Sequence, residues 1–317
     1  MHNKYILGID PSNYTTSICL LDLDGRVILN EKQLLFVREG ECGLRQSDAV
    51  FAHTKNLPVL MQKMKPHCMN ADIVAVGVST RPRNVDGSYM PCFLSGVSAA
   101  NAVSCACNAP LYEFSHQCGH LMAAIYSSGR EDLLTSSFCA FHVSGGTTEM
   151  LRVKSYRPKG FDCELVGGTL DSSAGQIIDR VGVRMGLSFP AGAQMEKRAI
   201  AYDKKVPNRK PPIKGLHVNL SGLENLANSI FDQTHDIGQT SAFVFKYIAR
   251  AIEELTRAYF VSYGESSVLY AGGVMSCSMI QNHLRSLFDA AFAEPYLSSD
   301  NALGIAELTR RKFLSEN

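Results

Sequence analysis

Short apolar runs along the chain alternate with stretches in which apolar residues recur every three or four positions. Continuous apolar runs predict strands, and the longer spacing predicts helices. In the first half we expect strands at residues 4–9, 16–22, 26–31, 72–78 and 110–114, and helices at 49–65, 94–107 and from about 117. Pro58 should kink or end the first of these helices. This alternation is typical of an α/β domain.

The second half of the chain repeats the opening pattern. Residues 138–144 and 148–155 predict two strands around the turn Gly145-Gly146-Thr147, much as the opening strands surround a turn. Helices are expected near 172–186, 222–235, 239–264 and from about 301, with a strand at 266–273. Two such units predict a duplicated α/β architecture with a cleft between related halves.

Length and composition narrow the class of protein. The 317 residues are long enough for two domains, and the 45% hydrophobic content excludes a disordered chain. A net charge of +1 gives no global case for a nucleic-acid or membrane partner, and no apolar run approaches the roughly 18–20 residues of a membrane span. The start of the chain does not resemble a signal peptide, and the ten cysteines are scattered without a CxxC pair. We therefore expect a reduced, cytoplasmic protein.

Segment 196–214 departs from this balanced composition. It holds seven Lys or Arg residues against two acidic residues, and three prolines. A solvated surface loop and a basic arm that faces nucleic acid both explain this composition, and both interpretations stay open.

Three turns of small residues follow predicted strands. They lie at Gly8–Ser17, at Gly145-Gly146 and at Gly272-Gly273. Such turns expose backbone N–H groups toward an anion, so together they suit a cleft that holds a nucleotide. Chance turns would give the same pattern.

Residues 171–179 place Asp171, Gly175 and Asp179 on one ridge of a predicted helix. The glycine between the two carboxylates would let a ligand approach the backbone. The carboxylates would then accept hydrogen bonds from its ribose hydroxyls. In the alternative, Asp171 is a helix cap and Asp179 a surface charge.

His116 and His120 lie at positions i and i+4 of a predicted helix, where two imidazoles can share a metal ion. A zincin protease needs a glutamate directly after the first histidine as general base, and Gln117 cannot take a proton, so the protease interpretation is excluded. The neighbouring sequence supplies no third ligand, although the distant Asp300 is an oxygen-ligand candidate. Neutral histidines with a carboxylate suit zinc or iron.

Taken together, these motifs resemble the TsaD family, the catalytic subunit of tRNA threonylcarbamoyladenosine synthase, within the ASKHA superfamily. The resemblance runs end to end through GIDPSNYTTS (8–17), AHTKNLP (52–58), HQCGH (116–120), VSGGTTEM (143–150), DSSAGQIIDR (171–180), FPAGA (189–193), LSGL (220–223), AGGV (271–274) and SDNA (299–302). It implies an α/β fold of the actin-like ATPase, ribonuclease H-like type with two domains around a cleft. The first would comprise residues 1–112 plus 301–317, and the second residues 113–300 with a helical insertion.

The resemblance also implies a site. His116, His120 and Asp300 would bind one divalent metal, iron or zinc, in the cleft, and an adenine nucleotide or threonylcarbamoyl-AMP would lie beside it. The residues implied to bind this substrate or nucleotide are Val143, Ser144, Gly145, Gly146, Thr147, Asp179, Gly192, Gly272, Gly273 and Cys277. Candidate phosphate contacts are Ser12, Thr15, Thr16, Arg81 and Arg83.

The chain departs from the family pattern at several of these positions. The family usually has an acidic pair where this chain has Tyr14 and Thr15, and its segment corresponding to 81–89 is shorter. Further departures are Thr147 for a histidine, Ser172 for an aspartate, Gln176 for a glutamate and Cys277 for an asparagine. The metal ligands persist while the residues that face the substrate change, which favours a divergent paralogue.

The implied activity is transfer of a threonylcarbamoyl group from threonylcarbamoyl-AMP to the N6 amine of the adenosine beside the tRNA anticodon. The protein would be a cytoplasmic acyltransferase whose partners are tRNA and either helper subunits of a threonylcarbamoylation complex or a second copy of itself, with no membrane. Two alternatives are a carbamoyl-type transferase with a non-tRNA acceptor and a non-catalytic scaffold partner.

Overall fold

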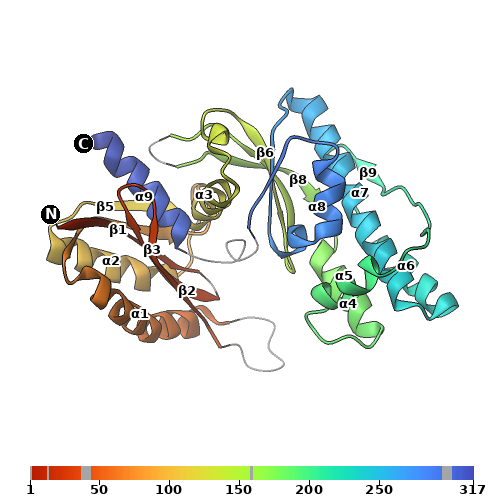
Figure 1. Ribbon diagram of the computed structural model, residues 1–317, viewed down its shortest axis with the longest axis horizontal. Coiled ribbons are helices and arrows are strands. Elements are labelled where there is room, and N and C mark those ends of the chain that lie inside the picture. Colours follow the sequence, from red (N-terminus) through yellow and green to blue (C-terminus); the bar gives the residue numbers. More distant parts are fainter. Residues whose placement is uncertain (1, 13, 37–43, 158–159, 295–301) are drawn as a thin grey trace. The chain divides into compact units, whose positions relative to one another are not determined.

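The structure is a computed structural model that describes residues 2–12, 14–36, 44–157, 160–294 and 302–317 (Figure 1). It divides into two compact units. Unit 1 comprises Met1–Glu131, Tyr156–Asp162 and Ser299–Asn317, and unit 2 comprises Asp132–Ser155 and Cys163–Ser298. The first boundary was expected between residues 112 and 113. It lies after Glu131 instead, because the strand at Leu111–Ser115 and the helix at His116–Ser128 belong to unit 1.

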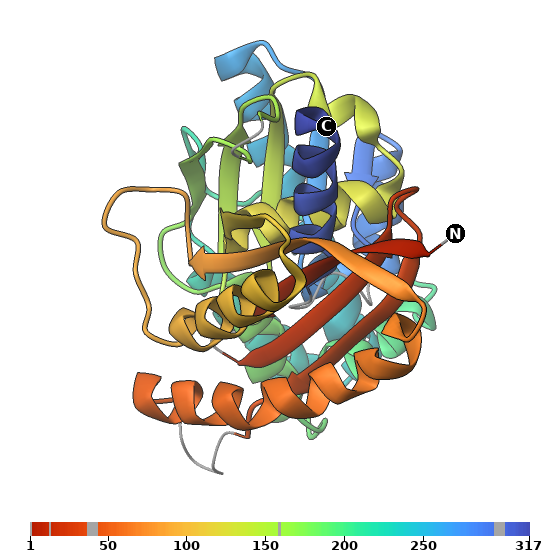
Figure 2. The ribbon, with the colours of Figure 1, turned by 90° about the vertical axis from the view of Figure 1, so that its left-hand side faces the viewer.

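Unit 1 is built on a five-stranded sheet in the order β3-β2-β1-β4-β5 (Figure 2). The strands are β1 (Asn3–Pro11), β2 (Thr15–Asp22), β3 (Val27–Leu34), β4 (Ala71–Arg81) and β5 (Leu111–Ser115). The first three pair antiparallel, whereas β1, β4 and β5 are parallel. Strands β1 and β2 are buried over almost their whole length, which is why the sequence shows continuous apolar runs rather than alternation.

Helices cover both faces of this sheet. They are α1 (Gln46–Cys68), α2 (Phe93–Cys107), α3 (His116–Ser128) and α9 (Leu303–Glu316). Helix α9 packs over the face of Gly8, where a Cβ atom would lie 2.6 Å from the backbone nitrogen of Ala306. Helix α2 packs over the opposite face, at Ile9. Of the two outcomes expected at Pro58, a kink or an end of the helix, the end is wrong, because α1 continues through Pro58 to Cys68.

Helices α3 and α9 cross at two glycines. A Cβ atom on Gly304 would lie 1.8 Å from the carbonyl oxygen of Gly119, so no larger side chain fits at this crossing. The first turns of the two helices therefore touch through their backbones, close to His116 and His120.

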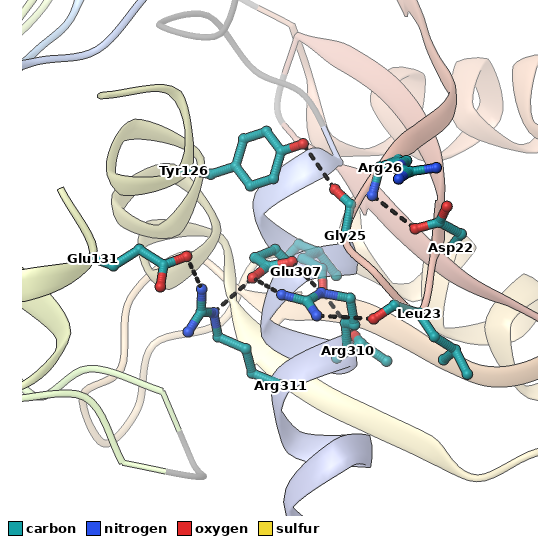
Figure 3. A network of polar contacts seen from close by, with 11 residues as sticks. Asp22, Leu23, Gly25, Arg26, Tyr126, Glu131, Glu307, Arg310 and Arg311 are labelled. Atoms are coloured by element: carbon teal, nitrogen blue, oxygen red, sulfur yellow. Dashed lines mark hydrogen bonds and ion pairs between the residues drawn. The ribbon is translucent and has the colours of Figure 1, made fainter. Parts of the chain in front are cut away.

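A buried polar network fastens the rest of α9 within unit 1 (Figure 3). Glu307 is 1% exposed and accepts hydrogen bonds from Arg310 Nε at 2.7 Å and Arg311 Nε at 2.6 Å. Arg310 also donates to the carbonyl oxygen of Leu23 at 3.0 Å, in the turn between β2 and β3. Arg311 reaches Glu131 Oε1 at 2.9 Å, just beyond α3. The buried carboxylate of Glu307 thus holds two arginines, and these join α9 to the turn at Leu23 and to Glu131.

Unit 2 repeats the topology of unit 1. Its seven-stranded sheet has the order β12-β11-β6-β7-β8-β10-β9. The strands are β6 (Phe138–Val143), β7 (Thr148–Val153), β8 (Cys163–Thr169), β9 (Ile213–Lys214), β10 (His217–Val218), β11 (Val268–Ala271) and β12 (Ala290–Phe292). The order and the strand directions of the first sheet recur here. Strands β1 to β5 correspond to β6, β7, β8, β11 and β12 in turn. The predicted duplication is confirmed.

The helices of unit 2 form its core with this sheet. They are α4 (Ala174–Arg184), α5 (Gly192–Ile200), α6 (Ser221–Thr234), α7 (Ile237–Tyr263) and α8 (Ser278–Arg285), with short 3₁₀ helices at Glu131–Leu134 (η1) and Gly273–Ser276 (η2). The helix expected at 239–264 is confirmed as α7, and Val244, Ile248 and Leu255 on one of its faces are buried. Helix α5 was not expected, and its last turns occupy the start of the basic segment. Within the described residues, no helix combines the length and apolar character needed to span a membrane.

Candidate active site

The two histidines singled out in the sequence converge at the start of α3. This helix begins directly after β5, and the Ser115 hydroxyl caps it by accepting a hydrogen bond from the backbone N–H of Cys118 at 3.3 Å. His116 and His120 are one turn apart, and their Nε2 atoms lie 2.9 Å from each other. The two imidazole rings therefore approach each other through their Nε2 atoms.

A buried carboxylate fixes the orientation of the first histidine. Asp10, which is 1% exposed, lies on β1, and its Oδ2 is 2.8 Å from His116 Nδ1. The Ser79 hydroxyl of β4 donates to the other carboxylate oxygen. A carboxylate accepts hydrogen bonds, so it favours the tautomer in which His116 Nδ1 carries the proton. His116 Nε2 then presents a lone pair toward His120.

This geometry fits a metal ion. Two imidazole nitrogens that bind one ion at about 2.0–2.1 Å lie about 2.9 Å apart at an angle of 90° and about 3.4 Å apart at the tetrahedral angle usual for zinc. The Nε2 atoms are 2.9 Å apart, at the short end of this range. A carboxylate behind a ligating histidine is the usual outer partner in such sites. In the part of the chain that the structure describes, no group of three ligand side chains forms. The expected third ligand, Asp300, lies outside the described residues.

The hydroxyls of Ser12 and Thr16 in the first hairpin already have hydrogen-bond partners in the protein. Ser12 Oγ donates to the carbonyl oxygen of Thr15 at 3.2 Å, and both residues are buried. Thr16 is fully buried, and its Oγ1 lies 2.8 Å from His53 Nδ1. Contact of Thr16 with a phosphate would require this hairpin to open away from α1, so the expected contact at Thr16 does not fit the observed packing.

The longer segment at 81–89 docks on the histidine helix. The carbonyl oxygen of Pro82 accepts a hydrogen bond from the backbone N–H of Gln117 at 3.0 Å. Arg81 Nη2 donates to Asn84 Oδ1 at 2.7 Å, so its guanidinium braces the segment. Arg83 is exposed. Of the two arginines among the expected phosphate contacts, Arg83 is the more accessible.

In unit 2, two of the predicted glycine turns meet. Ser144 N–H donates to the carbonyl oxygen of Thr147 at 2.8 Å, which closes the turn between β6 and β7. Gly145 and Gly146 at its tip are exposed. Gly272 has φ +100°, and a Cβ atom there would lie 2.3 Å from the carbonyl oxygen of Val143, so glycine is required. The turn at Gly272-Gly273 therefore packs against the base of the Gly145-Gly146 turn.

Beside these turns lies a cavity of about 630 Å³ on α4. Its lining residues are Gly145, Gln176, Asp179, Arg180, Val183, Arg184 and Phe189. This volume falls within the range of small-molecule sites. Asp179 Oδ1 accepts a hydrogen bond from the backbone N–H of Ala191 at 2.8 Å, which places Gly192 next to it as the first residue of α5. The structure thus brings Gly145 and Asp179 to one cavity and holds Gly192 near it.

Two other expected residues have different surroundings. Asp171 does not share a ridge with Asp179, because α4 begins only at Ala174. Its carboxylate instead accepts hydrogen bonds from the backbone N–H of Leu220 at 2.8 Å and from the Ser221 hydroxyl at 2.7 Å, at the start of α6. Cys277 is buried before α8, and burial raises the pKa of its thiol to about 12. Asp171 is a cap, and Cys277 is a neutral thiol.

Comparison with known proteins decides the family. The family model described as TsaD, tRNA N6-adenosine threonylcarbamoyltransferase, matches residues 37–307. The chain belongs to this family. Its curated TsaD relatives include those of Riemerella anatipestifer, 26% identical over 99% of this chain and 94% of the relative, and Campylobacter fetus subsp. fetus, 28% identical over 95% and 90%. The predicted family and its transferase class are confirmed.

Solved structures agree on the fold. HypF from T. kodakarensis superposes with a TM-score of 0.61 at 11% identity over 99% of this chain and 48% of that one. A ROK family glucokinase from Streptomyces griseus gives 0.52 at 12% identity over 97% and 99%. These similarities confirm the predicted actin-like ATPase fold of this TsaD protein.

Sequence reasoning missed the role of Asp10 behind His116. The residue was expected in an anion-binding turn, but it ends a buried strand. The carboxyl ends of parallel strands meet at one sheet edge. Strands β1, β4 and β5 end at Pro11, Arg81 and Ser115, each within two residues of Asp10, Ser79 or His116. That shared edge was the signal that could have found the contact.

Proposed function

We propose that this TsaD-family protein transfers a threonylcarbamoyl group from threonylcarbamoyl-AMP to the N6 amine of the adenosine beside the tRNA anticodon. The observation that carries the proposal is the pair of Nε2 atoms of His116 and His120, 2.9 Å apart and backed by Asp10. Membership in the family agrees with it.

In this proposal, unit 1 supplies the metal ligands. His116 and His120, with Asp300, would hold one divalent ion, iron or zinc. When bound, this ion would orient the threonylcarbamoyl group and polarise its carbonyl as a Lewis acid. Asp10 keeps the proton of His116 on Nδ1, and Ser79 keeps Asp10 in place.

Unit 2 would bind the nucleotide part of the donor. The cavity on α4 is large enough for an adenosine, and Val183 with the 74% exposed Phe189 offers apolar surface to the base. The exposed Gly145-Gly146 turn would present backbone N–H groups to the phosphate, where charge grows as AMP departs. Asp179 holds the Ala191 turn beside it.

The chemistry is acyl transfer from a mixed anhydride. The N6 nitrogen attacks the threonylcarbamoyl carbonyl carbon and forms a C–N bond. The bond from that carbon to the phosphate oxygen breaks, AMP leaves with the bonding electron pair, and the amine loses one proton. The residues named above bind and orient the reactants, and none of them is assigned as the base.

A second candidate has specific support. The family usually has other residues near the substrate at four positions, which in this chain are Thr147, Ser172, Gln176 and Cys277. These changes favour a carbamoyl-type transferase with a different amine or hydroxyl acceptor. Helper subunits of a threonylcarbamoylation complex and a cytoplasmic location belong to the first proposal only.

The test combines the purified protein with threonylcarbamoyl-AMP, unmodified tRNA and helper subunits at several loadings of iron or zinc. We expect modified adenosine in the tRNA, and His116→Ala should abolish it. His67→Ala, an exposed histidine on α1, is the matched control and should keep full activity. Absence of product at every metal loading would contradict the proposal, and product only with a non-RNA acceptor would establish the second candidate.

A further inference from the structure

A cationic cluster lies in unit 2 away from the cavity. Arg209 belongs to the basic segment that follows α5, whereas Lys246 and Arg250 are one turn apart on α7. They line one shallow recess, which they share with Pro207, Asn208, Phe243 and Tyr247. Three positive side chains from two elements thus meet at one place.

Contacts between the basic segment and α7 hold the recess together. Arg250 Nη1 donates to Asn208 Oδ1 at 2.6 Å and so holds the basic segment on α7. Phe243 and Tyr247 under the recess are buried, and Pro211 anchors the segment further along. Packed elements therefore set the backbone positions of the three cations, and the bond to Asn208 also holds the side chain of Arg250.

No acidic side chain among the described residues forms an ion pair with this cluster, and the exposed Asp203 is the one free acidic neighbour on its segment. Among the described residues, Arg209 and Lys246 make no ion pair, and Arg250 is bonded to a neutral amide. Lys204, Lys205 and Lys210 add exposed charge along the same segment. Glu196, one of its two acidic residues, is occupied by the backbone N–H and hydroxyl of Ser278. Like charges that converge without acidic partners repel one another, so an anion bound here would relieve this repulsion.

We propose that the cluster of Arg209, Lys246 and Arg250 binds phosphates of the RNA backbone. This inference rests on the proposed function, which makes tRNA the acceptor. Guanidinium and ammonium groups are the usual partners of phosphate oxygens. Three of the seven lining residues are cations, and two of the others, Phe243 and Tyr247, are buried, which suits a phosphate backbone better than a protein partner.

The cluster also belongs to the same unit as the cavity. Helix α5 starts beside Asp179, packs along α7, and leads directly into the segment that carries Arg209. At 1.5 Å per residue its nine residues span about 14 Å. RNA held on the cluster would therefore be held on the unit that carries the cavity.

The test is the double variant Arg209→Glu/Lys246→Glu, which leaves the bond between Arg250 and Asn208 in place. Its affinity for unmodified tRNA is measured by fluorescence anisotropy over a range of KCl concentrations. We expect the affinity to fall by at least about tenfold at moderate salt and the slope of log K against log[salt] to decrease by about two, one for each lost phosphate contact. In the transfer assay, KM for tRNA should rise while kcat at saturating tRNA stays unchanged.

The matched control is Lys65→Glu/Lys154→Glu, two exposed lysines elsewhere on the chain. Each double variant changes the net charge from +1 by four units to −3, so a general charge effect would weaken both equally. The conservative variant Arg209→Lys/Lys246→Arg should keep the affinity of the natural chain.

Three results would overturn the inference. These are an unchanged salt slope in the double variant, equal losses in the control, and tighter binding of poly-glutamate than of tRNA at the cluster. Failure of the proposed function is distinguishable, because a natural chain that binds tRNA through the cluster but transfers no threonylcarbamoyl group contradicts that function and leaves the RNA site standing.

Discussion

Asp10 ends a buried strand, and side chains from two other elements satisfy its carboxylate. The Ser79 hydroxyl donates to one oxygen, and His116 Nδ1 lies 2.8 Å from the other. A charged carboxylate is costly to bury unless it is paired in this way. The same contacts that make its burial tolerable also set the tautomer of His116, so the structural and chemical roles of this residue coincide.

Asp10→Asn should weaken metal binding by about 10–100-fold, the usual cost of removing an outer carboxylate partner of a ligating histidine. The amide keeps the size of the side chain but not the charge that holds the proton on His116 Nδ1. Iron and zinc affinities are measured by competition with a chelator.

Asp72→Asn, an exposed aspartate on β4, should leave both affinities unchanged and serves as the control. Metal binding by Asp10→Asn equal to that of the natural chain would refute this positioning role.

At the scale of elements, short polar side chains decide where the helices begin. Ser173 caps α4 by accepting a hydrogen bond from Gln176 N–H, which shortens the helix expected from residue 172. Asp171, displaced from α4, caps the distant α6 instead. Because the first N–H groups of a helix have no partner within it, such caps tie one element to another.

Asp171→Ala should lower the free energy of unfolding by about 0.5–2 kcal/mol at neutral pH, the usual cost of replacing a helix cap by alanine. Burial opposes ionisation of this carboxyl, but hydrogen bonds from the Ser221 hydroxyl and from the backbone N–H groups of Leu220, Ser221 and Ser172 outweigh it and hold its pKa well below the usual range.

The pH dependence of this contribution follows from the lowered pKa. The stabilisation is fully present above the unfolded-state pKa of about 3.9 and is lost as the pH falls through the lower folded-state value. Urea unfolding at pH 7 and at acid pH should therefore show a difference between the natural chain and Asp171→Ala that shrinks in acid. A difference that grows in acid would contradict this assignment.

At the scale of the whole chain, Glu307 shows how unit 1 is closed by residues far apart in the sequence. Through Arg310 and Arg311 it connects α9, near the C-terminus, to Leu23 and to Glu131 (Figure 3). The same helix crosses α3 through Gly304 and Gly119, beside the histidine pair. The register of α9 on α3 is thereby held at both ends.

Glu307→Gln should cost about 3–5 kcal/mol of unfolding free energy, because it leaves two largely buried guanidinium groups without their carboxylate. Glu131→Gln removes a partner of Arg311 that is 72% exposed and should cost about 0–1 kcal/mol.

The two variants are compared by urea unfolding followed by circular dichroism. Hydrogen exchange of the α9 amides would locate the loss. If both substitutions lower the free energy of unfolding by the same small amount, the buried carboxylate of Glu307 does not stabilise the two arginines as argued.

Most elements and the family could be predicted from the amino-acid sequence. Local spacing settles whether a segment is helix or strand, so the repeated strand–turn–strand pattern could be predicted and the structure confirms it. The pairing of His116 with His120 also follows from local spacing, since residues four apart share one helix face. Ordered motifs along the whole chain carried the resemblance to the TsaD family.

Only the tertiary structure decided which distant residues meet. Asp10 reaches His116 across 106 positions, and Arg310 reaches Leu23 across 287. These contacts depend on strand order and helix crossing, which no local period encodes. For the same reason the basic composition of 196–214 was visible in the sequence, whereas the convergence of Arg209 with Lys246 and Arg250 was not. Spacing along the chain determines elements, and packing between them determines sites.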